Sequence, residues 1–161
     1  MKEKKIQFSF DVYDSIDELP ADDQQLLIAA RKATARAYAP YSNFHVGAAA
    51  KLSNNKIVTG TNQENASYPV GICAERVLLS AISSLHPEVS VQTMAVSYQS
   101  QKIKSDHPIS PCGMCRQALQ EFEGRTNKPI RLILSGMKGA VYIINSASQL
   151  LPLAFSSEEL G

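Results

Sequence analysis

The chain has 161 residues, of which 44% are hydrophobic and 19% are charged. This length and composition are typical of one soluble globular domain that buries a core of its own without disulfide bonds. The 16 lysines and arginines nearly balance the 15 aspartates and glutamates, so the formal net charge is +1. Proteins that bind nucleic acids or membrane surfaces need a strongly basic surface, and this charge balance disfavours both classes.

The sequence also bears on where the protein resides. No segment approaches the ~20 apolar residues that are needed to cross a bilayer. The basic first residues are followed by acids rather than by the apolar run of a secretory signal. We therefore expect a cytoplasmic protein.

The first 19 residues are expected to form an N-terminal acidic arm, with a folded domain over residues 20–161. Six acids lie between Asp11 and Asp23 with no base among them, which is typical of a solvated surface segment. In the domain, apolar residues recur at spacings of three and four until a proline at position 40. This periodicity predicts a first helix over residues 20–40.

Short apolar runs separated by turn residues predict the remaining elements. Two strands joined at Asn54-Asn55 are expected to form an antiparallel hairpin. The expected strands are residues 46–52, 56–61, 91–97, 130–134 and 140–144. The expected further helices are residues 73–85 and 112–122, and a short helix followed by a turn ends the chain over 147–160. Helices that alternate with short strands indicate an α/β fold, here a three-layer α/β/α sandwich with a mixed five-stranded sheet.

The three cysteines, Cys73, Cys112 and Cys115, are an odd number and cannot all pair in disulfides. In a reducing compartment, clustered thiols are typical of metal ligands or catalytic groups. The alternative is three small buried hydrophobic residues. The Cys-x-x-Cys spacing of Cys112 and Cys115 favours the metal site, because residues three apart on a helix share a face.

Both cysteine motifs are expected to lie at helix N-termini, where the helix dipole favours the thiolate over the thiol. Three thiolates leave the fourth position of a tetrahedral zinc ion open, which is how catalytic zinc sites are built. A water activated at that position needs a nearby carboxylate to move its protons. Glu75 is placed for this task, since it follows Cys73 by two residues in an otherwise apolar segment.

Two arginines lie beside the thiols in the sequence. Three thiolates and one Zn²⁺ sum to a charge of −1, so a nearby cation would help to keep the activated water acidic. Arg76 is the main candidate for this contact with the thiolates, and Arg116 is a second one. The alternative for either side chain is an ordinary surface or structural ion pair.

Cys73-Ala74-Glu75, followed by Pro111-Cys112 and Cys115, resembles the zinc-dependent cytidine deaminases in their short-chain form, which has a three-cysteine zinc site. Three further segments resemble this family in the same order. They are residues 41–49 before the first strand, residues 62–68, which are similar to its nucleoside-binding segment, and residues 152–160 at the C-terminal end. The resemblance covers residues 20–160 and implies that residues 20–161 form a cytidine deaminase-like catalytic domain.

The resemblance implies roles for the residues of these motifs. Cys73, Cys112 and Cys115 would bind one Zn²⁺ per subunit. Glu75 would be the catalytic proton shuttle. The backbone N–H of Ala74 would hold the O2 carbonyl of the pyrimidine.

The resemblance also implies that Asn62 and Glu64 bind the ribose 3′-hydroxyl. Positions two apart in an extended chain point the same way, and an amide beside a carboxylate can both donate to and accept from a hydroxyl. The alternative is that Asn62 merely ends a strand in a turn. Phe44 would lie against the base. Tyr41 and Phe155 would approach a neighbouring subunit's site, because short-chain members are homotetramers with shared active sites.

The expected function is therefore hydrolysis of cytidine and 2′-deoxycytidine to uridine and 2′-deoxyuridine plus ammonia, in pyrimidine salvage. Deaminases of aminopyrimidine nucleoside antibiotics of the blasticidin type share the same motifs and remain an alternative. A non-catalytic zinc-binding module, which would not need Glu75, is a further one. A polynucleotide-editing deaminase is disfavoured, because the chain has no tryptophan and no basic patch for a strand channel. The expected partner is a small-molecule nucleoside, with no nucleic acid and no membrane.

Overall fold

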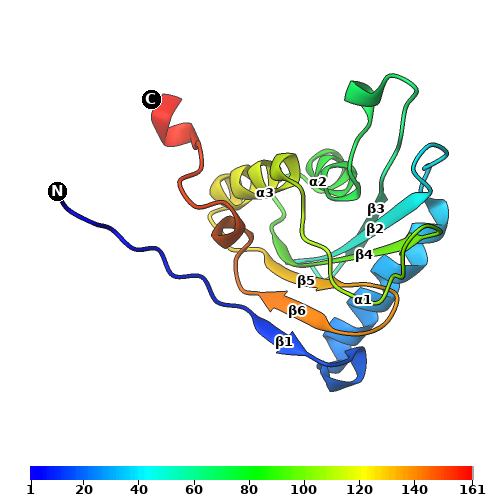
Figure 1. Cartoon of the computed structure of the whole chain (residues 1–161). Coiled ribbons are helices and arrows are strands. Elements are labelled where there is room, and N and C mark those ends of the chain that lie inside the picture. The colour runs from blue at the N-terminus through cyan, green and yellow to red at the C-terminus, as the bar shows by residue number, and fades with distance from the viewer. Residues whose placement is uncertain (161) are drawn as a thin grey trace.

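In the computed structural model, which describes residues 1–160, a twisted sheet separates one helix from two others (Figure 1). The strands follow the order β1-β6-β5-β4-β2-β3. Within the described residues only β4 and β5 run parallel, and the other neighbouring pairs are antiparallel. The mixed sheet and the three-layer α/β/α sandwich are thus confirmed.

The helices and strands lie close to the positions that the sequence predicts. The strands are β1 (Asp11–Tyr13), β2 (Phe44–Leu52), β3 (Ile57–Thr61), β4 (Val91–Ser100), β5 (Arg131–Ser135) and β6 (Val141–Ile144). The helices are α1 (Ala21–Ala33), α2 (Ala74–Leu85) and α3 (Gly113–Thr126). Short 3-10 turns occur at Ile16–Glu18, Thr34–Arg36, Tyr68–Val70, Ala147–Leu150 and Ser157–Leu160.

The sheet has six strands, and the expectation of five is wrong by one edge strand. The additional strand, β1, pairs antiparallel with β6, with Asp11 opposite Ile143 and Tyr13 opposite Val141. It has three residues and lies among acids, so the sequence pattern there indicates a solvated segment rather than a strand. Its backbone is ordered by the open edge of β6, which is a tertiary effect.

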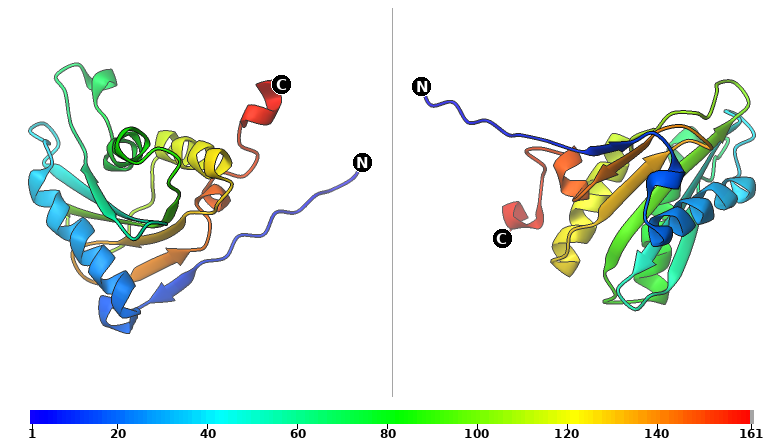
Figure 2. Two further views of the ribbon diagram at one scale, coloured as in Figure 1. Left: turned by 180° about the vertical axis from the view of Figure 1, so that it is seen from behind. Right: turned by 90° about the horizontal axis from the view of Figure 1, so that it is seen from below.

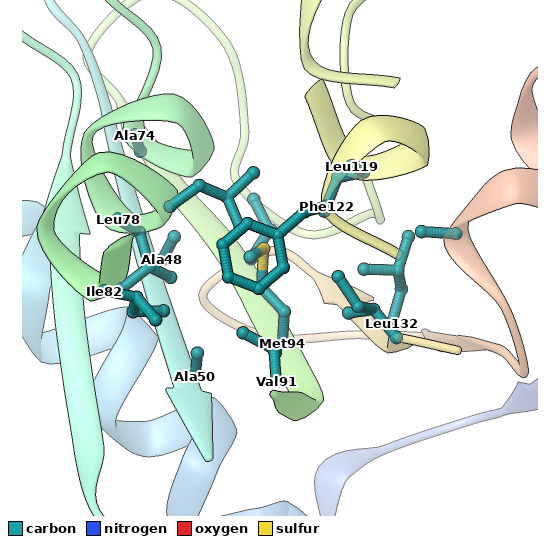
Figure 3. Packing of buried hydrophobic residues seen from close by; sticks show 14 of the residues in the cluster. Ala48, Ala50, Ala74, Leu78, Ile82, Val91, Met94, Leu119, Phe122 and Leu132 are labelled. Atoms are coloured by element: carbon teal, nitrogen blue, oxygen red, sulfur yellow. The ribbon is translucent and has the colours of Figure 1, made fainter. Parts of the chain in front are cut away.

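Each face of the sheet buries its own hydrophobic cluster, because side chains alternate along each strand. Ala48 and Ala50 of β2 face α2 and α3, whereas Ala49 between them faces α1. On the first face, Leu78 and Ile82 of α2 meet side chains of α3 and of the central strands (Figure 3). The two clusters fix α1 on one side of the sheet and the pair α2 and α3 on the other (Figure 2).

Gly60 of β3 lets the start of α2 lie directly on the sheet. A Cβ atom at this position would lie 2.7 Å from the carbonyl oxygen of Ala74 and 2.7 Å from the amide nitrogen of Leu78. Only glycine permits so close an approach of two backbones. The first turn of α2, which follows Cys73, is therefore held against β3. None of the helices in residues 1–160 is long and apolar enough to span a membrane.

Candidate active site and metal centre

The three cysteine sulfurs meet where the N-termini of α2 and α3 converge. The Sγ atoms of Cys73, Cys112 and Cys115 all lie within 4.8 Å of one another. Cys73 Sγ is 3.7 Å from Cys112 Sγ, which is 3.6 Å from Cys115 Sγ. Sulfur ligands about 2.3 Å from a tetrahedral zinc ion lie about 3.8 Å apart, so the two measured separations fit that ion.

The start of each helix positions its thiols. Cys73 is the N-cap residue of α2 and Cys112 is the N-cap residue of α3, and neither side chain caps its own helix. Their carbonyl groups instead accept the first helical hydrogen bonds, from Val77 N at 3.0 Å and from Arg116 N at 2.9 Å. Both side chains are thus free to turn toward Cys115, and the two helix dipoles favour negative charge where they meet.

Hydrogen bonding among the thiols shifts the pKa values of Cys73 and Cys115 in opposite directions. A hydrogen bond from Cys115, helped by one from Cys112 and by the charge of Arg76, lowers the pKa of Cys73 to about 6 against the opposing effects of burial and of Glu75. The pKa of the buried Cys115 thiol is raised, first by its hydrogen bond to Cys73 and then by burial. One thiolate is therefore favoured before any ion binds, which suits a divalent cation that needs deprotonated ligands.

Glu75 lies in the first turn of α2 and is only 5% exposed. Burial raises the pKa of its carboxyl group, and its backbone N–H and Cys115 only partly oppose this effect. A carboxyl group in such surroundings holds a proton more readily than one in water, as a general acid–base catalyst must.

A cavity of about 430 Å³ extends from Cys73 and Cys112 to the open end of the β2–β3 hairpin, where β2 begins and β3 ends. A volume of this size is typical of small-molecule sites. Its walls combine aromatic, aliphatic, amide, carboxylate and thiol groups from both sides of the site. They are Ser42, Phe44, Val46, Asn62, Glu64, Cys73, Ala74, Glu75, Ile109, Ser110 and Cys112. The structure thus brings Phe44, Asn62 and Glu64 together with Ala74 and Glu75 in one cavity.

The amide of Asn62 is fixed by the backbone of β2. Its Oδ1 accepts from Val46 N at 2.7 Å, and its Nδ2 donates to Phe44 O at 2.9 Å. This side chain therefore links the end of β3 to the start of β2 and has a defined orientation at the cavity wall. The alternative, that Asn62 merely ends a strand in a turn, does not account for these two hydrogen bonds.

Glu64 is held by the loop that precedes β2. Its carboxylate accepts hydrogen bonds from Tyr41 N at 2.8 Å, from Ser42 N at 3.3 Å and from the Ser42 hydroxyl. Burial alone would raise the pKa of Glu64, but these hydrogen bonds and the charge of His45 together lower it. Glu64 is thus an ionised hydrogen-bond acceptor at neutral pH.

The ring of Phe44 is supported from behind by Tyr98. The two rings stack with centroids 5.0 Å apart and planes 16° apart. Tyr98 is fully buried, and its hydroxyl group lies 3.2 Å from Lys104 O and 3.2 Å from the ring nitrogens of His107. Phe44 is therefore a rigid wall of the cavity.

Tyr41 and Phe155 lie outside this cavity. Tyr41 lines an adjoining cavity of about 350 Å³, which shares Ser42 and Glu64 with the first. Phe155 is 58% exposed in the C-terminal segment, where its backbone oxygen accepts from Gln117 Nε2 at 2.9 Å. Within one chain, these two aromatic residues do not line the same cavity as Glu75.

The two arginines beside the thiols have different surroundings. Arg76 acts on Cys73 through its charge, and its Nη1 lies 4.0 Å from the sulfur of Met114. Arg116 instead binds backbone, since Nε donates to Pro111 O at 2.8 Å and Nη1 to Leu150 O at 3.1 Å. These bonds stabilise the loop before α3, so Arg116 has a structural role there, through backbone hydrogen bonds rather than through the ion pair given as the alternative.

Four cavity residues were not predicted, namely Ser42, Val46, Ile109 and Ser110. Ser42 lies two residues before Phe44 and Ser110 lies next to Pro111, so both fall in or beside the motifs of the sequence. Their nearness in sequence to those motifs is the only feature of the sequence that could have indicated them. The contact of Ser42 with Glu64 depends on a pairing across 22 positions.

Comparison with known proteins agrees with this geometry. Residues 20–128 match the model of a family described as the cytidine and deoxycytidylate deaminase zinc-binding region. A cytidine deaminase of Sporosarcina psychrophila is 36% identical over 141 residues, which covers 87% of this chain and 96% of that protein. One of Halalkalibacterium halodurans is 34% identical over 140 residues, which covers 87% and 98%.

Solved structures show the same similarity. The cytidine deaminase of Burkholderia pseudomallei is 38% identical with a TM-score of 0.71, over 81% of this chain and 97% of that one. The cytidine deaminase of Mycobacterium tuberculosis is 33% identical with a TM-score of 0.65, over 84% and 98%. The matched zinc-binding region and the cluster of three thiols are together consistent with one Zn²⁺. This chain therefore belongs to the cytidine and deoxycytidylate deaminase family of zinc-binding hydrolytic enzymes.

Proposed function

We propose that this protein hydrolyses cytidine and 2′-deoxycytidine to uridine and 2′-deoxyuridine plus ammonia. The observation that carries the proposal is one cavity in which two thiols of the three-thiol cluster and a buried carboxyl group lie together with an aromatic ring, an amide and a second carboxylate. The relatives named cytidine deaminase support the choice of substrate.

The metal chemistry is assigned to the three thiols. A zinc ion held by Cys73, Cys112 and Cys115 would supply the Lewis acid that activates a water molecule for attack on C4 of the pyrimidine. The charge of Arg76 helps to lower the pKa of Cys73, which supports its assignment as the charge partner of the thiolates. The open fourth position of such a site leaves room for the reacting water.

Glu75 moves the protons in the proposed reaction. Its carboxylate accepts a proton from the attacking water and donates that proton to N3 of the pyrimidine. It then accepts the remaining proton of the former water and passes it to the 4-amino group, which leaves as ammonia. Burial raises the pKa of this carboxyl group and so moves the pKa toward neutral pH. A group with such a pKa can both accept and donate a proton, which suits both steps of the transfer.

The other cavity residues orient the nucleoside. Ala74 is the first residue of α2, so its backbone N–H has no partner within the helix and is available to the O2 carbonyl. Phe44 packs against the base. Asn62 and Glu64 bind the 3′-hydroxyl, as donor and acceptor. Since both ribose and deoxyribose carry that hydroxyl, these contacts support both substrates.

Assembly, location and organisation complete the proposal. We assign a homotetramer with shared active sites, which is supported by the exposure of Tyr41 and Phe155 outside the chain's own catalytic cavity. Three free cysteines support a reducing compartment such as the cytoplasm, and pyrimidine salvage as the setting. The family match begins at residue 20, which supports an N-terminal arm over residues 1–19 and a catalytic domain over 20–161.

The test is cytidine turnover, followed by ultraviolet absorbance on purified protein and on protein stripped with a chelator. We expect conversion that the chelator abolishes and zinc restores. Glu75→Gln should retain zinc and fold but lose about 10²–10⁴-fold in kcat, whereas the exposed Glu121→Gln should match the wild type. Turnover that survives Glu75→Gln would contradict the proton-shuttle role. Turnover of an antibiotic nucleoside but not of cytidine would select the alternative substrate class.

A further inference from the structure

The N-terminal segment over residues 2–14, here called the arm strand, leaves the body of the molecule as an extended chain (Figures 1 and 2). Residues 1–10 are all exposed. Only the last part of the arm strand is paired, where β1 joins β6. Within residues 1–160, the other edge of β1 has no strand beside it, since β1 is the terminal strand of the sheet. Unpaired edges of this kind readily accept another strand.

The arm strand is apolar on one face. Its even positions carry four large hydrophobic side chains with much of their surface in solvent. They are Ile6, Phe8, Phe10 and Val12, with exposures of 63%, 43%, 42% and 57%. Phe8 stacks on Phe10 at 5.6 Å, and Phe10 contacts Tyr142 of β6 at 4.9 Å. An apolar row of this length on the exposed face of a strand indicates a surface that binds a partner.

We propose that two copies of this protein pair their arm strands antiparallel, edge to edge, with Phe8 of one copy opposite Phe8 of the other. Residues 2–5 of each copy would then lie along β1 of its partner as a further strand. The pairing obeys two-fold symmetry, so every contact other than that between the two Phe8 residues occurs twice.

The charges of the arm strand fit this register. Lys5 comes opposite Asp11 of the second copy, and Lys2 comes opposite Asp14. Opposite charges at facing positions stabilise an antiparallel pair. On the apolar face, Ile6 comes opposite Phe10. In the single chain the only nearby acid for Lys5 among the described residues is Glu3, at 3.9 Å in a pair with side chains 80% and 76% exposed, so little holds Lys5 there.

Other registers are less favourable. Centring the pair on Gln7 would place Glu3 opposite Asp11, and like charges at facing positions are destabilising. A slip by one residue would set the apolar face of one strand against the polar face of the other. Centring on Ser9 keeps one kind of opposite-charge pair, Lys4 with Asp14, and is therefore the register that an experiment must separate from the proposed one.

The complementarity lies within a single sequence, which identifies the partner as a second copy of the same chain. Basic residues begin the arm strand and acidic residues end it, so only an antiparallel twin brings the two ends together. The arm strand precedes residue 20, where the family match begins. The proposal is therefore independent of the deaminase reaction and can be tested without an activity assay.

Disulfide trapping tests the register directly. Facing residues of an antiparallel pair have Cα atoms about 4.5–5.5 Å apart, which is within the range of a disulfide. A Phe8→Cys chain should form at least about ten times more covalent dimer under mild oxidation than a Gln7→Cys chain. Gln7 faces Ser9 in this register, and its own copy lies diagonally at about 7–8 Å, which is too far. The unmodified chain controls for its native thiols.

Charge exchange tests the partner. In the Phe8→Cys background, Lys5→Glu should lower dimer formation about fivefold, because two attractive pairs become repulsive. Adding Asp11→Lys should restore it, which a merely local role of Lys5 would not do. Dimer from Ser9→Cys but not from Phe8→Cys would overturn the register. Yields no higher than that of the unmodified chain, or no rescue by Asp11→Lys, would overturn the pairing.

Discussion

Replacing Gly60 with alanine should separate the start of α2 from the sheet and misplace the carboxyl group of Glu75, the proposed proton shuttle. The new Cβ would lie 2.7 Å from backbone atoms of Ala74 and Leu78, whereas ordinary contacts begin at 3.4 Å. The helix must therefore move away from β3 by about 0.7 Å, since neither backbone atom can rotate aside. Cys73 and Glu75 flank Ala74 and would move with it.

The expected effects follow from that displacement. Overpacking of this kind costs about 1–3 kcal/mol in the free energy of unfolding. A misplacement approaching 1 Å at the reacting groups costs up to about 10²-fold in rate. We therefore expect Gly60→Ala to fold, to bind zinc more weakly, and to lose about 10-fold to 10²-fold in kcat/KM for cytidine. Urea unfolding, metal analysis and the absorbance assay measure the three quantities.

Gly124 in α3 provides the matched control. No atom lies within 4 Å of a Cβ built on Gly124, so alanine fits there without any movement. Gly124→Ala should stabilise the helix by about 0.5–1 kcal/mol and leave kcat/KM unchanged. If Gly60→Ala unfolded and turned over like the wild type, the close packing of α2 on β3 would not position the site, and the reasoning would be refuted.

Three other changes test separate parts of the structure. Glu123 is buried, and its Oε1 accepts from Ile130 N at 2.6 Å while its Oε2 accepts from Ser148 N at 3.1 Å. Glutamine would set its NH2 group against one of these N–H donors, so Glu123→Gln should cost about 2–3 kcal/mol in urea unfolding with the zinc content unchanged. Tyr98→Leu removes the ring behind Phe44 and should raise KM for cytidine about fivefold with a smaller effect on kcat, while Tyr98→Phe keeps KM near that of the wild type. Cys112→Ala should lose zinc by metal analysis, and unchanged metal content would refute its assignment as a ligand.

Much of the fold follows from local sequence pattern. The strands of the sheet interior are short apolar runs between turn residues, and Asn55, with φ of 63°, supplies the left-handed turn of the β2–β3 hairpin. The edge strand β1 could not be found in this way. Three residues among acids carry no periodic signal, and their order comes from the edge of β6, which is more than 120 positions away.

The residues of the candidate site also differ in whether local sequence pattern could predict them. Spacing alone indicated Cys112 and Cys115, because the two thiols lie within one helical turn. Tyr98 and Ser42 escaped prediction, because each acts on a residue of another segment. Tyr98 reaches Phe44 only through the pairing of β4 with β2, and Ser42 reaches Glu64 only through the folded loop before β2. Local patterns predict which residues can do the chemistry, whereas strand pairing decides which residues support them.

In the free site the amide of Asn62 and the carboxylate of Glu64 already have hydrogen-bond partners, and this shapes how the site would select a nucleoside. Both ends of the Asn62 amide are bonded to β2, and Glu64 accepts three hydrogen bonds from the loop before it. A 3′-hydroxyl would therefore replace or add to existing hydrogen bonds and would not supply a missing partner to a buried polar group. A site discriminates strongly when its buried polar groups have no hydrogen-bond partner unless the correct ligand is bound. A site whose polar groups already have partners discriminates only weakly. In the proposed reaction the sugar contacts would then serve mainly to orient the base, and the discrimination between pyrimidines would fall to the rigid wall of Phe44, the Ala74 amide and the proton chemistry of Glu75.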